Sequence, residues 1–245
     1  MQMSDLKKRF ITGVAILVVS FALIFIGGWP FNIFVIALTA LMSFEFDFMR
    51  KDGFKSFVLV AIPLLLAEKI EYALLATLIA TAFPIAAKRW WLAASVVYLA
   101  LPAISIMWLR NHDDTGISAI FWLVFVVVAT DIGGYFAGKL FGKRKLAPAI
   151  SPNKTWEGLA GGVALASLAS FVVTFFSFSF MVLGAIFAVI EQVSDLMESA
   201  IKRRFGVKDS GSILPGHGGI MDRLDGLVLV APIVAGLTYF GLMQW

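Results

Sequence analysis

Four ionisable residues recur at helical spacing inside an apolar stretch in the C-terminal part of the chain. Glu191, Asp195, Glu198 and Lys202 follow one another at intervals of four, three and four residues, which places them on one face of a helix. Ionisable groups are costly to bury in an apolar helix and mark functional candidates by default. This face is therefore the first candidate for a site that carries out chemistry.

Three further carboxylates belong to the same half of the chain. Asp131 lies well inside an earlier apolar stretch, and Asp222 and Asp225 open the last one. An acidic cluster without Cys or His ligands suits Mg²⁺ or another hard cation. The alternative is that each acid only pairs with Lys or Arg at a helix end. That alternative fits Asp195 poorly, because this residue lies about two turns from the basic end of its helix.

The first of two basic loops, residues 139–154, reads KLFGKRKLAPAISPNK. Ser151 is predicted to cap the following helix, with Pro152 at its first position. The free N–H groups and the dipole of a helix N-terminus suit a phosphate chain, and the Lys154 ammonium adds a mobile cation. The alternative is ordinary helix capping combined with the basic charge that is typical of cytoplasmic loops.

The second basic loop, residues 202–223, reads KRRFGVKDSGSILPGHGGIMDR. Its PGHGG stretch lets the backbone approach a ligand closely, because glycine has no Cβ. Lys202, Arg203, Arg204 and Lys208 could clamp phosphates, or they could hold anionic lipid head groups. His217 by itself is more typical of a structural histidine in a turn. Neither loop matches a Walker motif or a dinucleotide-binding fingerprint, so ATPase and NAD-dependent activities are not supported.

The elements that carry these residues are predicted to lie in a membrane. Of the 245 residues 60% are hydrophobic and 15% charged, with a mean hydropathy of +0.91, and a soluble domain of this size could not bury so much apolar surface. The net charge of +4 does not indicate a nucleic-acid partner, because the basic residues form short clusters between apolar runs. There are no cysteines and hence no disulfides. The apolar run after Lys7, Lys8 and Arg9 is interpreted as an uncleaved first membrane helix.

A spanning helix needs about 20 mostly apolar residues. The predicted fold is an all-α, polytopic membrane helix bundle with about nine transmembrane helices, at residues 10–27, 29–49, 54–67, 72–87, 90–109, 117–141, 156–178, 179–201 and 225–243. The third and fourth are short and could form one bent or re-entrant pair. With a cytoplasmic N-terminus, only Lys69 and Arg110 of the 20 Lys and Arg residues fall outside, as the positive-inside rule requires. Glu45 and Asp47 border the second span and are interpreted as a solvated helix end.

The chain divides into two parts of one bundle. Residues 1–115 form five N-terminal spans with few polar groups, and residues 116–245 form a catalytic half of four spans with the two basic cytoplasmic loops. Internal repeats and inverted halves of the transporter kind are not visible. Gly134, Gly138 and Gly142, and likewise Gly158 and Gly162, recur four apart, which predicts close helix packing within the bundle or between subunits.

The polar motif in the second half resembles that of the phosphatidate cytidylyltransferases, also called CDP-diacylglycerol synthases. The residues that fit its pattern are Ser199, Lys202, Arg203, Lys208, Asp209, Pro215, His217, Gly218, Gly219, Asp222, Arg223 and Asp225. Segments 131–142 and 150–158 also resemble the family, and the likeness covers residues 117–235. Ser194 is a departure, because many relatives have glycine there, and its hydroxymethyl group could crowd a metal site.

The resemblance implies transfer of the cytidylyl group of CTP to phosphatidic acid, with Mg²⁺ as cofactor, K⁺ as a possible second ion and a possible homodimer. The implied catalytic residues are Asp195, Asp222, Lys202, Arg223 and His217. The implied metal ligands are Asp195 and Asp222, with Asp225, Glu198 and Asp131 in support. The implied substrate-binding residues are Ser151, Lys154, Thr155, Ser199, Arg203, Lys208, Asp209, Gly218 and Gly219. The enzyme would sit among the lipids of the inner (cytoplasmic) membrane, with its site facing the cytoplasm.

Two other functions compete with this interpretation. A related cytidylyltransferase could act on another lipid phosphate, because acyl chains are recognised by unspecific apolar surface. A cation or lipid transporter would use the intramembrane acids as coupling sites, but it would not require the His-Gly-Gly loop or so many phosphate-binding cations. A phosphotransferase that consumes CDP-lipids is disfavoured, because the motif of that family is absent from the sequence.

Overall fold

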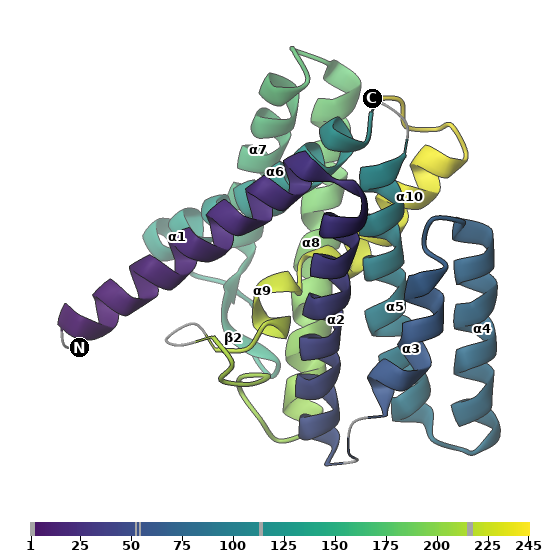
Figure 1. Ribbon diagram of the computed structural model, residues 1–245. Helices are drawn as coiled ribbons and strands as arrows, with labels where there is room; N and C mark the ends of the chain where they lie inside the picture. Colours follow the sequence, from purple (N-terminus) through teal and green to yellow (C-terminus); the bar gives the residue numbers. More distant parts are fainter. Residues whose placement is uncertain (1–2, 52, 54, 113–114, 215–217) are drawn as a thin grey trace.

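Helices make up most of the protein in a computed structural model. The structure describes residues 3–51, 53, 55–112, 115–214 and 218–245, with backbone only for residues 3–12 and 15. The helices are α1 (Met3–Ile26), α2 (Gly28–Arg50), α3 (Ser56–Leu65), α4 (Ile70–Ala86), α5 (Trp90–Asn111), α6 (Gly116–Phe141), α7 (Trp156–Val173), α8 (Phe178–Arg204), α9 (Met221–Leu224) and α10 (Leu227–Tyr239). Two short strands, β1 (Lys145–Ala147) and β2 (Ser151–Thr155), precede α7 (Figure 1). The expected all-α class is confirmed apart from this hairpin.

Each of the nine apolar segments predicted from the sequence contains a helix. Five of these helices, α2, α5, α6, α7 and α8, are long and apolar enough to cross a membrane. The apolar helices α3, α4 and α10 are shorter, as is the part of α1 with described side chains from Ile16 to Ile26. With 10 residues, α3 extends only about 15 Å, which is half of the hydrocarbon core of a bilayer. The protein is therefore an integral membrane protein whose third and fourth apolar segments are short, as expected.

The bundle is arranged around α5, which is the most deeply buried of the long apolar helices. It packs against α2, α3, α4 and α10, while α6, α7 and α8 form a second group beside it (Figure 1). The N-terminal end of α1 projects away from the bundle, whereas its C-terminal part contacts α2 and α6 (Figure 1). The core is thus shared between the two halves of the chain.

Close packing of α6 on α7 explains the glycine spacing. A Cβ on Gly158 would lie 3.0 Å from the carbonyl oxygen of Gly134, and a Cβ on Gly162 would lie 2.9 Å from that of Thr130. Both distances are tighter than ordinary contacts, so the helices approach each other as closely as glycine allows. The predicted helix-packing role of these glycines is confirmed within the chain.

The start of α7 differs from the prediction. Residues 151–155 form β2, which pairs antiparallel with β1 in the register Lys145 to Thr155 and Ala147 to Ser151. Thr155 is the N-cap, and its side-chain oxygen accepts a hydrogen bond from Gly158 N–H at 3.0 Å. The predicted Ser151 cap was therefore wrong, because pairing with β1 keeps this segment extended up to Thr155.

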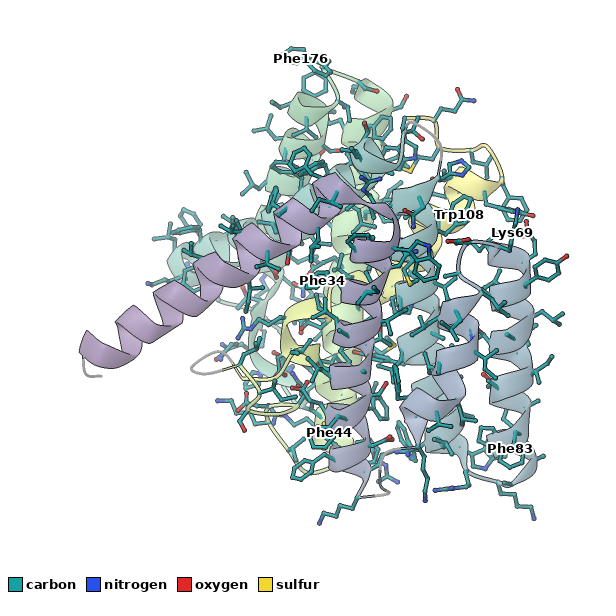
Figure 2. All side chains as sticks on the ribbon, in the orientation of Figure 1. Phe34, Phe44, Lys69, Phe83, Trp108 and Phe176 are labelled. Carbon is teal, nitrogen blue, oxygen red and sulfur yellow. The ribbon has the colours of Figure 1, made fainter. Side chains whose placement is uncertain are left out.

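Both basic loops lie at the same end of the bundle. The hairpin and the loop after α8 gather near the C-terminal end of α2, where Figure 2 labels Phe44. Phe176, in the turn between α7 and α8, marks the opposite end (Figure 2). The polar residues that the sequence singles out are therefore brought toward one end of the molecule.

Candidate functional site

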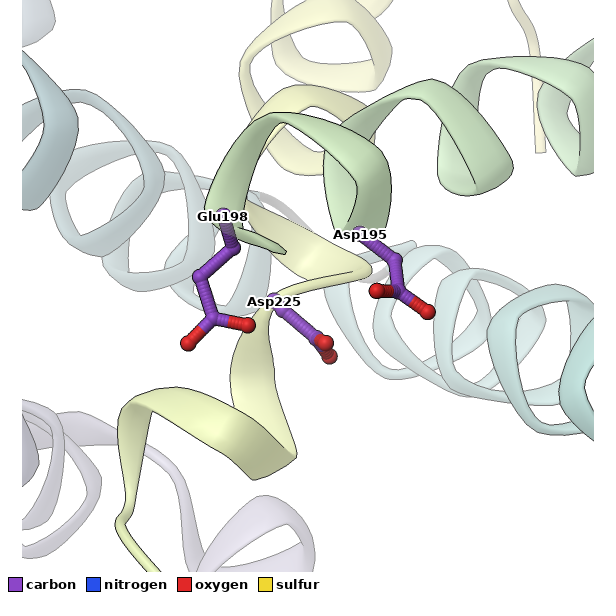
Figure 3. Close-up of side chains that lie close together, drawn as sticks. All are labelled: Asp195, Glu198 and Asp225. Carbon is purple, nitrogen blue, oxygen red and sulfur yellow. The ribbon is translucent and has the colours of Figure 1, made fainter. Parts of the chain in front are cut away.

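Three carboxylates meet where α8 passes the end of α9. Asp195 and Glu198 project from α8, and Asp225 follows the last residue of α9 (Figure 3). One oxygen atom from each of the three lies within 4.8 Å of the others. The regular α8 helix brings the first two together because they are three residues apart. We call Asp195, Glu198 and Asp225 the acid cluster.

The acid cluster has fewer hydrogen-bond donors than its charge requires. Glu198 is fully buried, and its Oε1 atom receives no hydrogen bond from an N–H or hydroxyl group of the described residues. Lys154 forms an ion pair with Asp195, and Lys202 Nζ lies 3.1 Å from Glu198 Oε2. Buried carboxylates need opposite charge or donors. The orphaned oxygen and the all-oxygen donor set therefore fit a hard cation such as Mg²⁺.

Lys202 also reaches Asp222, which organises the second basic loop. Lys202 Nζ donates to Asp222 Oδ1 at 2.6 Å. Asp222 Oδ2 accepts from Gly219 N–H at 2.9 Å and from Ser210 N–H at 3.1 Å. Burial alone would raise the pKa of Asp222, but the hydrogen bonds from Lys202, Gly219 and Ser210 outweigh it and lower the pKa below its ordinary value. Asp222 is thus an ionised anchor that joins both ends of the loop to α8.

Glu45, near the C-terminal end of α2, holds the same loop from the other side. Its side chain is 1% exposed and accepts from Ile220 N–H and Met221 N–H at 2.9 Å each. Ser210 Oγ donates to it at 3.0 Å. The interpretation of Glu45 as part of a solvated helix end was wrong, because the loop folds over the end of α2 and encloses the carboxylate.

Asp47 is buried in the same way. Its oxygens accept from the backbone N–H groups of Lys55 and Ser56 at 2.7 and 2.8 Å and from Arg50 at 2.7 Å. The solvated interpretation of this residue was also wrong, since Asp47 joins the ends of α2 and α3. The only sequence signal was two acids at the end of an apolar span, and that pattern does not reveal their donors.

The remaining predicted residues surround the cluster at different depths. Arg203 donates to the carbonyl oxygens of Ile150, at 3.3 Å, and Val207, at 3.1 Å, which connects the first loop to the end of α8. Ser199 Oγ donates weakly to Asp195 Oδ1 at 3.4 Å. Exposed positions are occupied by Lys208, Asp209 and Arg223. Gly218 has a positive φ of 86° and pairs with Leu214, whereas the predicted catalytic residue His217 lies outside the described residues.

Two further side chains lie on the α8 face. Glu191 is 2% exposed and interacts with Asp131 of α6 through their side chains. Ser194 Oγ donates to the carbonyl oxygen of Asp225 and accepts from Leu229 N–H at 3.2 Å. The hydroxyl of Ser194 therefore bonds to the backbone of Asp225, after α9, and of Leu229, in α10, and does not project among the three carboxylates.

Comparison with known proteins connects this geometry to a family. A model of the cytidylyltransferase family matches residues 7–240. The phosphatidate cytidylyltransferase of Bacillus subtilis (strain 168) is 36% identical over 261 residues, covering 95% of this chain and 97% of that protein. The phosphatidate cytidylyltransferase of Brucella suis is 36% identical over 251 residues, covering 95% of this chain and 93% of that protein. The phosphatidate cytidylyltransferase of Helicobacter pylori (strain 26695) is 34% identical over 256 residues, covering 96% of this chain and 92% of that protein.

These matches run through both halves of the chain, including the five N-terminal helices that the sequence motif does not reach. The resemblance drawn from the polar motif is confirmed, and it extends to the part of the chain that carries Glu45 and Asp47. The chain belongs to the cytidylyltransferase family.

Proposed function

We propose that this chain transfers the cytidylyl group of CTP to phosphatidic acid, giving CDP-diacylglycerol and pyrophosphate for phospholipid biosynthesis. One observation carries the proposal. A chain that matches phosphatidate cytidylyltransferases over 95% of its length gathers three carboxylates and two lysines at one end of a membrane bundle. Carboxylates that bind a cation, beside lysine ammonium groups, are suited to phosphoryl chemistry.

The reaction is an in-line displacement at the α-phosphorus of CTP. A phosphate oxygen of phosphatidic acid forms the new P–O bond, and the bond from the α-phosphorus to the oxygen bridging it to the β-phosphate breaks. Its electron pair leaves with pyrophosphate. The nucleophile is already an anion at neutral pH, so no strong general base is needed, and His217 would have a secondary role. Positioning and neutralisation of charge supply the catalysis.

The cations of the site hold the phosphates. Lys202 has a fixed position between Glu198 and Asp222, and Lys154 lies beside Asp195, so both ammonium groups are held at the acid cluster. The exposed Lys208 and Arg223, together with Arg203, extend the positive charge toward water, where CTP approaches. The other predicted substrate contacts are Ser151, Thr155, Ser199, Asp209, Gly218 and Gly219.

Asp195, Glu198 and Asp225 would hold the divalent cation. When bound, Mg²⁺ supplies positive charge to phosphate oxygens that no side chain can match. Asp222 and Asp131 stay predicted supporting ligands, and we rank Asp222 lower because its oxygens already accept three hydrogen-bond donors. K⁺ is proposed only as a second ion, in line with the family resemblance.

The proposed topology has nine membrane crossings, a cytoplasmic N-terminus and the site on the cytoplasmic face of the inner membrane. The collection of both basic loops at one end of the bundle supports it. In the cysteine-free chain, a cysteine replacing the exposed Lys145 should react with an impermeant maleimide only from the cytoplasmic side. One replacing Phe176, at the opposite end, should react only from outside; labelling of Lys145→Cys in sealed cells would refute this orientation.

We propose that residues 1–115 and 116–245 are two parts of a single bundle. Formation of a homodimer stays a prediction.

The activity itself is tested with purified protein, radiolabelled CTP, phosphatidic acid and Mg²⁺. We expect label in a chloroform-soluble product, with ATP supporting turnover poorly. Comparable rates with ATP would contradict the cytidylyl assignment, and no lipid product with any nucleotide would contradict nucleotidyl transfer. Phosphatidic acid and an ether-linked phosphatidate are compared to identify the lipid.

A further inference from the structure

A separate recess of about 370 Å³ lies between α6, β2, α7 and α8. Its polar side chains are Tyr135, Lys139, Asn153, Lys154, Thr155 and Gln192, and its wall includes Gly134. Two ammonium groups and two amides provide N–H donors, and no carboxylate is among the described residues that line it. Such a donor set is suited to an oxyanion.

The recess is placed for an anion that belongs to a lipid. Gly134 and Tyr135 lie inside α6, which is long enough to cross a membrane, about one turn deeper than Lys139. Neighbouring α6 side chains are strongly exposed and apolar, with Phe136 57% and Leu140 70% exposed. Lys139 Nζ donates to Tyr135 Oη at 3.3 Å, so its charge is held at the rim. A head group could enter between these side chains while its acyl chains stay along α6.

Lys154 connects the recess to the acid cluster. It lines the recess and forms the ion pair with Asp195. A phosphate in the recess would therefore share this ammonium group with Asp195 and would be held next to the cluster. By contrast, Lys208 is exposed on the loop after α8 and Arg223 is exposed on α9, where a soluble triphosphate can reach them.

We propose that this recess binds the phosphate monoester of the lipid substrate, apart from the place where the triphosphate of the nucleotide binds. The inference rests on the proposed function, because it assigns one of the two substrates of that reaction to a subsite. It adds Lys139, Asn153 and Gln192 as lipid-selective residues.

The test measures the apparent KM for phosphatidic acid and for CTP separately, in mixed micelles. The total mole fraction of anionic lipid is kept constant with phosphatidylglycerol, so that loss of a surface cation does not itself change lipid attraction. Lys139→Gln and Gln192→Ala should each raise the KM for phosphatidic acid at least about threefold, with the KM for CTP unchanged within about twofold. Lys143→Gln changes an exposed lysine four residues later in the chain that does not line the recess; it is the matched control and should change neither KM.

A steric variant tests the same recess independently of charge. A Cβ on Gly134 would have its nearest neighbour, Gly158 O, at 3.6 Å, so Gly134→Ala should fold and should narrow the recess. It should raise the KM for phosphatidic acid, whereas Gly236→Ala, where a Cβ meets nothing within 4 Å, should not. A raised KM for CTP alone, or unchanged constants in all recess variants, would overturn the inference. A wild-type protein that makes no lipid product would instead contradict the proposed function.

Discussion

Two groups of buried or half-buried carboxylates lie at the same end of the bundle and differ in what surrounds their oxygens. Glu45 and Asp47 of α2 accept hydrogen bonds from backbone N–H groups and neighbouring side chains. The acid cluster places three carboxylates against one another, and Glu198 Oε1 has no hydrogen-bond donor among the residues that the structure describes. A carboxylate whose oxygens already accept hydrogen bonds stabilises the fold, whereas carboxylates that face each other need a bound cation. Burial alone therefore does not distinguish a functional acid from a structural one. The hydrogen-bond donors around the carboxylate do.

The largest effect on turnover should follow from removing negative charge from the acid cluster. Asp195→Asn and Asp225→Asn should each reduce turnover at least ~10²-fold, about 2.7 kcal/mol, because a neutral amide binds a hard cation poorly. The fold should survive, since the change also removes repulsion between carboxylates. Thermal unfolding in detergent provides a second measurement. Mg²⁺ should raise the melting temperature of the wild type and not that of the variants.

Glu68→Gln, an exposed acid between α3 and α4, is the control for that experiment. Well-folded Asp195→Asn protein that keeps most of its turnover at saturating Mg²⁺ would show that the cluster is structural, like Glu45.

Glu45→Gln should mainly destabilise the protein. The carboxamide is isosteric, but its NH₂ group would face the N–H donors of Ile220 or Met221, so a buried donor loses its partner. We expect a loss of about 3 kcal/mol in the free energy of unfolding, the upper end for a hydrogen bond to a charged group. Activity should fall because the loop that carries Asp222 is loosened. A melting temperature equal to that of the exposed-acid control Glu68→Gln would contradict this role.

Gly219→Ala should act on the same contact more weakly. A Cβ at this position would overlap with Ser210 Oγ, which donates to Glu45, and would lie 2.7 and 2.8 Å from the two oxygens of Glu45, so the loop must shift. We expect turnover to fall about tenfold, equivalent to 1.4 kcal/mol, with the KM for phosphatidic acid little changed. The double variant with Glu45→Gln should lose less turnover, expressed as activation free energy, than the sum of the two single losses, because both changes disturb one contact. Full additivity would show that they act separately.

Ser194→Ala should have the smallest effect. It removes two hydrogen bonds to the backbone of Asp225 and Leu229, which are expected to contribute about 1–2 kcal/mol to stability. Turnover should stay within about twofold of wild type, because the hydroxyl does not project among the carboxylates. A large rise in turnover would instead mean that Ser194 does crowd the cluster.

The sequence predicted most of the helices because long apolar runs interrupted by charge leave few alternatives. It also predicted that Glu191, Asp195, Glu198 and Lys202 share one helix face, since helical periodicity is local. Glu45 could not be interpreted in this way. Its donors are the N–H groups of Ile220 and Met221, 175 and 176 residues later in the chain. An acid at the end of an apolar helix has the same local pattern whether water or a distant loop surrounds it.

The strand at residues 151–155 was missed for a related reason. Ser-Pro-Asn-Lys-Thr has a good capping residue at each end, and only pairing with β1 selects Thr155 as the cap. Likewise, the sequence gives no indication that Asp222 bonds to Ser210 and Gly219 across the loop. Contacts that close a loop on itself depend on its three-dimensional path, which local propensities do not determine.

The pairing of Glu198 with Lys202 has a consequence for how the protein is made. The two residues are one helical turn apart, so their ion pair can form within α8 alone, before any other helix or metal ion is present. An apolar helix with three acids would otherwise be expensive to transfer from the translocon into lipid. Lys202 thus accompanies Glu198 into the bilayer as an internal counter-ion, and a newly synthesised chain can integrate before it has acquired a cation.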